Sequence, residues 1–268
     1  MDWRPASPLA ARKYRPCGNW PQSGMMYANP DQQLIESMKP DSSDAQVTRI
    51  FDRLARYRRS TRGFLPRPVE PAVLEQVFTT AAYAPSNCNT QPWQAHVVSG
   101  ATRDRLSRIF LEETIAQGRY SLDFPYDGKY RDIYRKRQID VAVLLYQALG
   151  VERDDTEGRQ RAFLRNLEFF DAPHVVFLFM PDWGGIREAA DVGMYAQNLM
   201  LAIQSHGLAS CPQTTLGYDA DTVRREVGIG PSMKLLFGIS FGYEDTSKPE
   251  NQIVPARAAL DESVQFHE

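Results

Sequence analysis

Three arginines and a serine within five residues form the first group with chemical potential. The run Arg58-Arg59-Ser60-Thr61-Arg62 follows a segment with helical spacing, so these side chains are expected at a helix end. Guanidinium groups bind phosphate oxygens through paired hydrogen bonds, and a hydroxyl between them adds another donor. The run favours a phosphate-binding segment, and its alternative is a solvated surface run of arginines.

A second group of polar side chains lies between two prolines. The segment Ser86-Asn87-Cys88-Asn89-Thr90-Gln91 is preceded by Pro85 and followed by Pro92. The prolines restrict the backbone, while the amides and hydroxyls offer donors and acceptors together. This composition suits recognition of the polar edge of a heterocycle, and it is also typical of a turn before a strand.

Other catalytic motifs are absent from the sequence. There is no GxSxG, HExxH or P-loop pattern, and the four histidines lack metal-ligand spacing, so we predict no metal site. Gly228-Ile229-Gly230 lacks the third glycine and the preceding strand of a dinucleotide fingerprint. Cys88 has no evident base, and a lone cysteine is more often a small packed residue than a nucleophile.

The spacing of apolar residues predicts the elements that position these groups. Helices are predicted at 44–57, with Ser43 or Asp44 as N-cap, and at 71–83, 102–118, 134–149, 156–170, 192–203 and 221–227. Strands are predicted at 93–99, 174–180, 208–211 and 235–241. This alternation indicates α/β or α+β packing, with helices in the majority.

Composition excludes several classes of partner. The chain has 268 residues, with 31 Lys and Arg against 33 Asp and Glu, so a net charge of -2 provides no overall field for nucleic acid or anionic membrane. The longest strongly apolar run, 175–180, is far shorter than the roughly 20 residues of a membrane span. Three widely spaced cysteines without a CxxC pair favour a reducing compartment, and we expect a cytoplasmic protein.

The order and spacing of the two polar groups resemble the FMN-dependent nitroreductase-like family. The resemblance runs from about Ala45 to the C-terminus. Further matching pieces are the helix at 193–203, the turn Pro212-Gln213-Thr214-Thr215, and Arg257 in the C-terminal segment.

The resemblance implies an α+β fold, a three-layer sandwich in which helices flank a mostly antiparallel sheet. It implies a homodimer with exchanged C-terminal tails. A flexible N-terminal arm is expected at 1–43, followed by one FMN-binding domain at 44–268. Within that domain a lid loop is expected at 119–135, and a tail at 243–268 is expected to pack on the partner subunit.

The resemblance also implies which side chains hold FMN. They are Arg58, Arg59, Ser60, Arg62, Ser86, Asn87, Asn89, Gln91, Gln213, Thr214, Thr215 and Arg257. Arg58, Arg59 and Ser60 would hold the phosphate and ribityl chain, Arg257 would close on the phosphate, and Arg62 would lie near N1 and the C2 carbonyl. Ser86, Asn87 and Asn89 would line the ring from the second subunit, with Gln91 supporting them. The 213–215 turn would face N5.

The implied activity is that of an FMN-dependent NAD(P)H oxidoreductase acting on nitroaromatic or quinone-like acceptors. NADH or NADPH would deliver hydride to the flavin and leave before the acceptor enters, which is a ping-pong sequence. No catalytic side chain is assigned, because the cofactor carries the chemistry. A flat aromatic substrate would stack on side chains of the lid, unless these are ordinary loop aromatics; they are Phe124, Tyr126, Tyr130 and Tyr134.

Two alternatives stay open from the sequence. Reductive dehalogenases of halogenated phenols and halotyrosines have a similar arginine segment and Thr-Thr turn. Aligning their lid tyrosine with Tyr134 puts Tyr130 in place of their acidic lid residue and Leu167 in place of their lid lysine. An amino-acid zwitterion would then lack charged partners, which favours nitro or quinone reduction. The second alternative is a flavin-binding or flavin-degrading protein without NAD(P)H turnover.

Overall fold

The computed structural model describes residues 45–126 and 128–268. Contacts within the chain divide it into Met1–Val47 and Thr48–Glu268, and the strands of the described residues lie in the second unit. The expected N-terminal arm and the N-cap at Ser43 or Asp44 lie outside the described residues. The expected helix that follows is present as α2, Ala45–Tyr57.

Four antiparallel strands form the sheet of the second unit. They are β1 (Gln94–Ser99), β2 (His174–Pro181), β3 (Ala209–Gln213) and β4 (Met233–Gly242). Their order is β1-β2-β4-β3, so β1 and β3 are the edge strands. Each strand falls on a predicted segment, which confirms the expected antiparallel sheet.

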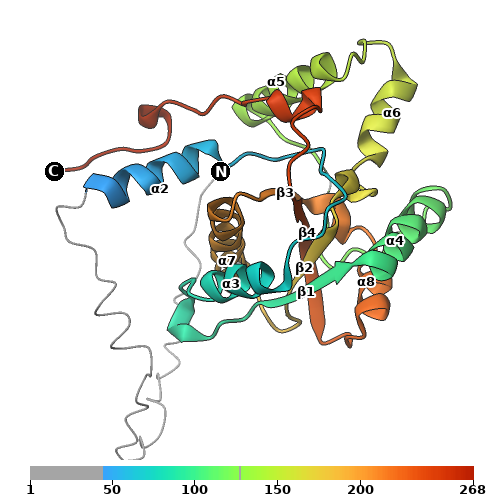
Figure 1. The fold of residues 1–268 in the computed structure, drawn as a ribbon, viewed down its shortest axis with the longest axis horizontal. Coiled ribbons are helices and arrows are strands. Elements are labelled where there is room, and N and C mark those ends of the chain that lie inside the picture. The colour runs from blue at the N-terminus through green and yellow to red at the C-terminus, as the bar shows by residue number, and fades with distance from the viewer. Residues whose placement is uncertain (1–44, 127) are drawn as a thin grey trace, which may run out of the picture. The chain divides into compact units, whose positions relative to one another are not determined.

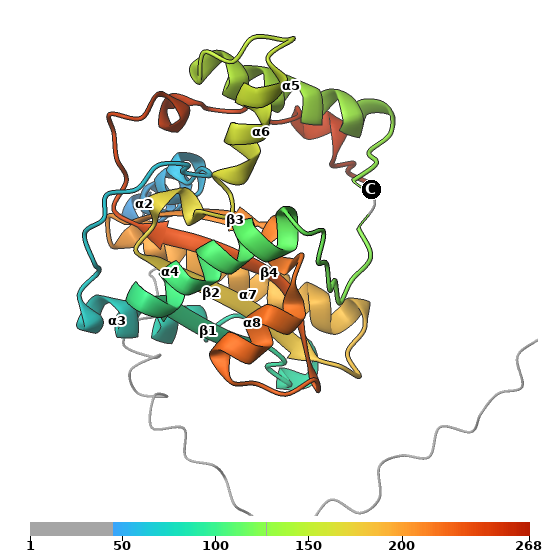
Figure 2. The ribbon, with the colours of Figure 1, turned by 90° about the vertical axis from the view of Figure 1, so that its right-hand side faces the viewer.

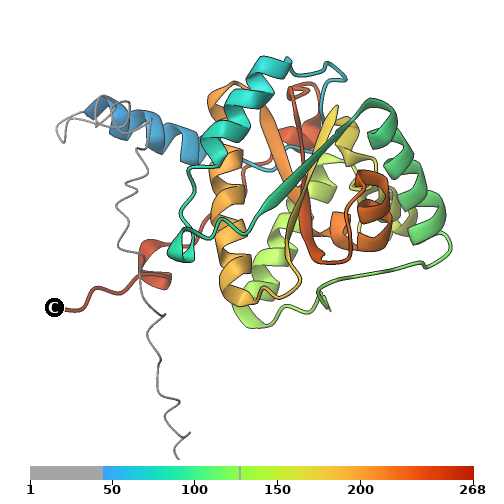
Figure 3. The ribbon, with the colours of Figure 1, turned by 90° about the horizontal axis from the view of Figure 1, so that it is seen from below.

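One face of the sheet is covered by α4 (Gly100–Ile109) and α8 (Ala220–Val227), and the other by α3 (Pro71–Ala81) and α7 (Ile186–Ser205). Figure 3 shows these two pairs of helices on opposite sides of the strands. Successive residues of β2 enter opposite cores, because strand side chains alternate between faces. Val175 and Phe177 pack with Leu106 and Val223, whereas Val176 packs with the α3 and α7 side chains. Burial on both faces explains the continuous apolar run of β2.

The helices α5 (Asp132–Ala148) and α6 (Thr156–Leu164) stand apart from this sandwich (Figures 1 and 2). No residue of α5 is buried. The α6 helix begins at Asp155, whose carboxylate accepts a hydrogen bond of 2.7 Å from the Gly158 amide. A side chain at 158 would collide with this cap, because a Cβ there would lie 2.1 Å from Asp155 Oδ2.

Some predicted helix boundaries were wrong. The helix expected at 156–170 ends at Leu164. It could not include the end of the predicted range, because Phe169 and Phe170 take positive φ angles of 57° and 55°, which a right-handed helix cannot contain. The helix expected at 71–83 ends at Ala81, and the one expected at 102–118 starts at Gly100 and becomes π-helical over Phe110–Ile115.

The lid loop expected at 119–135 is also shorter than predicted. Helix α5 starts at Asp132, so Tyr134 lies within a helix. The beginning of the loop is fastened to the sandwich: the Ser121 amide donates to the Tyr218 carbonyl at 2.9 Å, and Asp123 Oδ2 accepts from the Leu235 amide at 2.7 Å. Arg224 pairs with the same carboxylate. Any hinge of a lid therefore lies after Asp123.

A search of the described residues for a helix of sufficient length and hydrophobicity to cross a bilayer finds none.

His174, at the start of β2, makes the stability of the fold depend on pH. Its Nε2 accepts a hydrogen bond of 2.9 Å from the Val69 amide, and its Nδ1 lies 2.5 Å from Ser99 Oγ. Burial lowers the pKa of the ring. Below about pH 6.5 the unfolded chain protonates this ring more readily than the folded chain, so the free energy of unfolding falls as the pH drops. Above that pH both states are neutral and the effect vanishes.

We expect His174→Gln to lose less stability than the wild type when urea unfolding is compared between about pH 7.5 and about pH 5.5. His206→Gln, at the exposed C-terminal end of α7, serves as the control and should retain the wild-type dependence. An equal pH dependence in His174→Gln and the wild type would show that this ring does not govern the effect.

Candidate functional site

The arginine segment is attached to the edge of the sheet. Ser60 forms a parallel bridge with Ser210 of β3, and the Thr61 amide donates to the Ser210 carbonyl at 3.1 Å. Strand β3 continues to Gln213 and leads directly into the short helix Thr214–Gly217. The sheet edge thus brings the arginine segment beside the strand that carries the predicted N5 turn, although the two are far apart in the sequence.

Asn251 ties the same segment to the C-terminal part of the chain. Its side chain is 1% exposed. The Oδ1 atom accepts from the Arg62 amide at 2.7 Å, and the Nδ2 atom donates to the carbonyls of Gly63 at 2.8 Å and Asp245 at 2.9 Å. Because both ends of the amide are used, the backbone at 62–63 has one fixed position relative to residues 245–251.

Arg59 is held by groups of its own chain. Its guanidinium pairs with Glu244 at 2.6 Å and donates from Nε to the Asn251 carbonyl at 2.9 Å. Both charged side chains are largely buried, since 18% of Arg59 and 14% of Glu244 is exposed. Arg59 therefore fastens the beginning of the tail to the arginine segment and shares its positive charge with a carboxylate.

Arg58 and Arg257 are in a different situation. Both line a cavity of about 730 Å³, together with Tyr57 and Asn251. Burial, followed by the nearby charge of Arg257, lowers the pKa of Arg58. Among the described residues no carboxylate lies within 4.0 Å of either guanidinium. The one carboxylate of the lining, Asp52, is paired with Arg56. An anion would therefore stabilise the two like charges of Arg58 and Arg257.

The turn after β3 offers a buried hydroxyl. Thr215 Oγ1 has no hydrogen-bond partner among the described residues, and neither has Ser210 Oγ. In contrast, the side chain of Gln213 is fully engaged, because its Oε1 accepts from Ser240 Oγ at 2.5 Å and its Nε2 donates to the Asn166 carbonyl at 2.8 Å. Gln213 thus positions the turn, and Thr215 retains an open polar atom.

Cys211 lies close to the arginine segment but is not a nucleophile. Complete burial raises the pKa of its thiol to about 11, although Arg62, Ser60 and Arg58 act in the opposite direction. A thiol with that pKa is protonated at neutral pH, and the thiolate is the reactive form.

The turn from Ser86 to Gln91 has a strained backbone. Cys88, Asn89 and Gln91 take φ angles of 51°, 57° and 46°, which non-glycine residues rarely adopt. Ser86 Oγ accepts from the Gln91 amide at 2.9 Å, and the buried Asp191 of α7 accepts from the Asn87 amide at 3.1 Å. Figures 1 and 2 show this turn at the start of β1, away from the end of α2. One chain therefore does not bring it to the arginine segment.

The four predicted substrate-binding aromatics differ in burial. Phe124 packs against the core on the α3 and α7 side of the sheet. Tyr126, Tyr130 and Tyr134 are exposed, and the Tyr134 ring centroid lies 6.0 Å from the guanidinium carbon of Arg137. Only the three tyrosines are thus placed to meet a molecule from outside the chain.

Three residues that position the site were not found from the sequence. They are Asp191, Glu244 and Asn251. Asn251 lies in a segment without periodicity, and its partners are mainly backbone groups, which carry no residue-specific signal. Asp191 is a carboxylate on the otherwise largely apolar buried face of α7. A charged residue at such a position could have pointed to it from the sequence.

Comparison with known proteins identifies the family. The family model described as the nitroreductase family matches residues 55–243. The chain belongs to the nitroreductase family. It is 44% identical to nitroreductase NfnB of Mycolicibacterium smegmatis over 228 residues, which cover 85% of this chain and 97% of that protein.

Other nitroreductases share the sequence and the fold. The chain is 33% identical to the nitrobenzene nitroreductase of Ectopseudomonas oleovorans, over 81% of this chain and 96% of that one. The crystal structure of the FMN-dependent nitroreductase NfnB from Mycobacterium smegmatis in complex with NADPH superposes with a TM-score of 0.80, covering 83% of this chain and all 100% of that chain at 44% identity. The expected nitroreductase-like α+β fold is thereby confirmed.

Replacing Asn251 with alanine should lower the free energy of unfolding by about 2 kcal/mol, because buried partners lose their hydrogen bonds. The measurement is urea unfolding, with Gln252→Ala as the matched control. Gln252 is exposed and makes one long hydrogen bond to the Thr246 carbonyl, so its loss should change stability by less than about 0.5 kcal/mol. Equal effects of the two substitutions would disprove the central role of Asn251.

Proposed function

We propose that this nitroreductase-family chain is an FMN-dependent oxidoreductase that uses NADPH to reduce nitroaromatic or quinone-like acceptors. The observation that carries the proposal is the pair Arg58 and Arg257, which line one cavity and have no carboxylate of the described residues within 4.0 Å of either guanidinium. The activity named for the relative with 44% identity supports the same conclusion.

The described residues offer suitable groups to both the phosphate end and the ring end of FMN. A phosphate would neutralise Arg58 and Arg257, with Arg59 and Ser60 adjoining them. Farther along the sheet edge, the buried hydroxyl of Thr215 has no hydrogen-bond partner among the described residues, and the turn that carries it is the segment expected to meet the heterocycle. We therefore propose that Arg58, Arg59, Ser60 and Arg257 hold the phosphate end, and that the 214–215 turn meets the ring.

When bound, FMN supplies the redox chemistry, taking hydride from the nicotinamide and passing electrons to the acceptor. The chain supplies position and charge. Asn251 holds the Arg62 backbone, and the Arg62 guanidinium provides positive charge that stabilises an electron-rich ring. Cys211 keeps its proton because burial raises its pKa to about 11, so it takes no part in proton transfer.

We propose that a second copy of the chain completes each site. The exposed turn from Ser86 to Gln91 would reach the ring from the partner, since it does not reach the arginine segment of its own chain. Helix α5 buries none of its residues, and Ile139 and Val143 are among its exposed apolar side chains. In the described chain the tail also contacts α5, through an ion pair of 3.0 Å between Arg137 and Glu262. The unusual apolar exposure of α5 supports a homodimer.

Dehalogenation of halotyrosines is the weaker reading. Leu167, which aligns with the lid lysine of those enzymes, is 1% exposed and packs in the core. Tyr130, which aligns with their acidic residue, has a phenol in place of a carboxylate. Neither position provides a charged partner for a zwitterion.

Cysteine usage still favours a reducing compartment, and we propose the cytoplasm on that ground.

Anaerobic mixing of the FMN-loaded protein with NADPH should bleach the flavin absorbance, and a nitroarene should restore it. NADH, a quinone and a halotyrosine are the comparison reagents. If neither NADPH nor NADH bleaches the flavin, the result would instead support a flavin-binding or flavin-degrading protein. Faster reoxidation by the halotyrosine than by the nitroarene would support the dehalogenase alternative.

Arg58→Ala and Arg257→Ala should each weaken FMN binding by about 10-fold to 100-fold, because each removes a charge-assisted hydrogen bond to the phosphate. The measurement is titration of flavin-free protein with FMN, followed by fluorescence. Arg119→Ala is the control, since Arg119 is 65% exposed and pairs with Glu113. Unchanged FMN affinity in both variants would remove these arginines from the phosphate site.

A further inference from the structure

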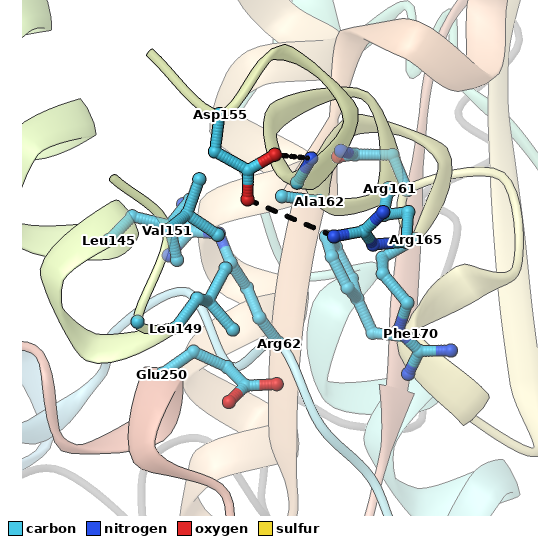
Figure 4. A pocket seen from close by; sticks show the side chains of 13 residues that line it. Arg62, Leu145, Leu149, Val151, Asp155, Arg161, Ala162, Arg165, Phe170 and Glu250 are labelled. Atoms are coloured by element: carbon cyan, nitrogen blue, oxygen red, sulfur yellow. Dashed lines mark hydrogen bonds and ion pairs between the residues drawn. The ribbon is translucent and has the colours of Figure 1, made fainter. Parts of the chain in front are cut away.

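A cavity of about 300 Å³ lies beneath the α5 and α6 helices (Figure 4). Its walls come from the end of α5, the start of α6, the segment at 165–170, Arg62 and Glu250. Of these, only Arg62 belongs to the predicted FMN site. The apolar part of the lining consists mainly of Leu145, Leu149, Val151, Ala162 and Phe170.

Glu250 is the unusual member of this lining. The residue is 9% exposed, and its carboxylate makes no hydrogen bond or ion pair with any described residue. Its oxygens are not fully buried, since they keep access to the cavity. Figure 4 shows the carboxylate pointing into the cavity, in the space between Leu149 and Phe170. A buried carboxylate without a partner is unfavourable, so a donor from outside the chain would stabilise it.

The other acidic group of the cavity is already satisfied. Asp155 accepts from the Gly158 amide at 2.7 Å and lies 3.8 Å from Arg161. Arg165 is similarly occupied, because it pairs with Glu168 at 2.5 Å and with Asp171 at 2.6 Å. Glu250 is thus the open acceptor of this cavity.

Arg62 supplies the complementary group. Its guanidinium makes one long hydrogen bond, 3.4 Å, to the Ser60 carbonyl, and among the described residues no carboxylate lies within 4.0 Å of it. With five N–H donors, one guanidinium can serve two ligands. The cavity therefore presents an acceptor and a donor in an otherwise largely apolar lining.

We propose that this cavity binds a single-ring aminoarene that carries a second, hydrogen-bond-accepting substituent. The amino group would donate to Glu250, the acceptor substituent would receive a hydrogen bond from Arg62, and the ring would lie among the leucines and Phe170. A dry cavity of about 150 Å³ suffices for benzene, so this volume suits one substituted ring and excludes a dinucleotide.

The site goes beyond the proposed nitro reduction, and its test needs no turnover. Isothermal titration of the FMN-loaded protein with 4-aminobenzoate should give saturable binding, whereas benzoate, which lacks the amino donor, should bind about tenfold more weakly. Absence of saturable binding of 4-aminobenzoate up to about 10 mM would overturn the proposal.

Two variants locate the ligand. Glu250→Gln removes the anionic acceptor while keeping the shape, and should weaken 4-aminobenzoate binding by about tenfold and bring it close to that of benzoate. Ala162→Phe fills the cavity and should abolish binding. Glu112→Gln, at an exposed acid of the π-helical segment, should bind like the wild type. Wild-type affinity in both cavity variants would place the ligand elsewhere and overturn the proposal.

Thermal unfolding separates ligand binding from a structural role of Glu250. Without ligand, Glu250→Gln should melt at the wild-type temperature or above it, because an unpaired buried charge has been removed. With 4-aminobenzoate, the wild type should melt higher and Glu250→Gln should gain little. A lower melting temperature of the ligand-free variant would show that Glu250 serves the fold, and would overturn its assignment as an open acceptor.

Discussion

The side chain of Asn251 connects the arginine segment with the beginning of the C-terminal tail, beside an isolated β-bridge between Phe64 and Glu244. It bonds the Arg62 amide and the Gly63 carbonyl on one side, and the Asp245 carbonyl on the other. The arginine segment is itself paired with the β3 edge at Ser60, so the amide locks the sheet edge, the arginines and the start of the tail into one unit. Arg58 and Arg257 line one cavity because both of their segments begin at this connection.

The arginines of one short run have different roles because their surroundings differ. Arg59 forms an ion pair with Glu244 and so connects the tail to the arginine segment. Arg58 has a second guanidinium as its neighbour and no carboxylate, which leaves it available to an anion. Arg62 faces the cavity that contains the unpartnered Glu250. Overall neutrality of the chain is thus compatible with strong local charge, since each contact acts over a few ångströms.

The helices α5 and α6 are attached to the sandwich by few contacts. Helix α5 has no buried residue, and the loop that precedes it is attached to the sandwich at Ser121 and Asp123. Such an element depends on something outside the sandwich for much of its burial. A partner subunit on its exposed face and a small ligand beneath it would both supply contacts that the single chain lacks.

Several features followed from the sequence by itself. The strands, the long helix α7 and the arginine run were predictable because periodicity and side-chain chemistry are local properties. The family followed from the order of the two polar groups. Boundaries at Leu164 and Asp132 were missed, since they depend on backbone angles at residues without a glycine or proline signal.

The tertiary structure alone decided how the polar groups are used. It pairs Arg59 with Glu244 and engages Gln213 within the chain. Among residues 45–126 and 128–268 it leaves the side chains of Thr215 and Glu250 without partners. No local sequence pattern distinguishes a polar side chain that has a hydrogen-bond partner within the chain from one that has none. That difference arises only when segments distant in the sequence are packed together and water is excluded between them.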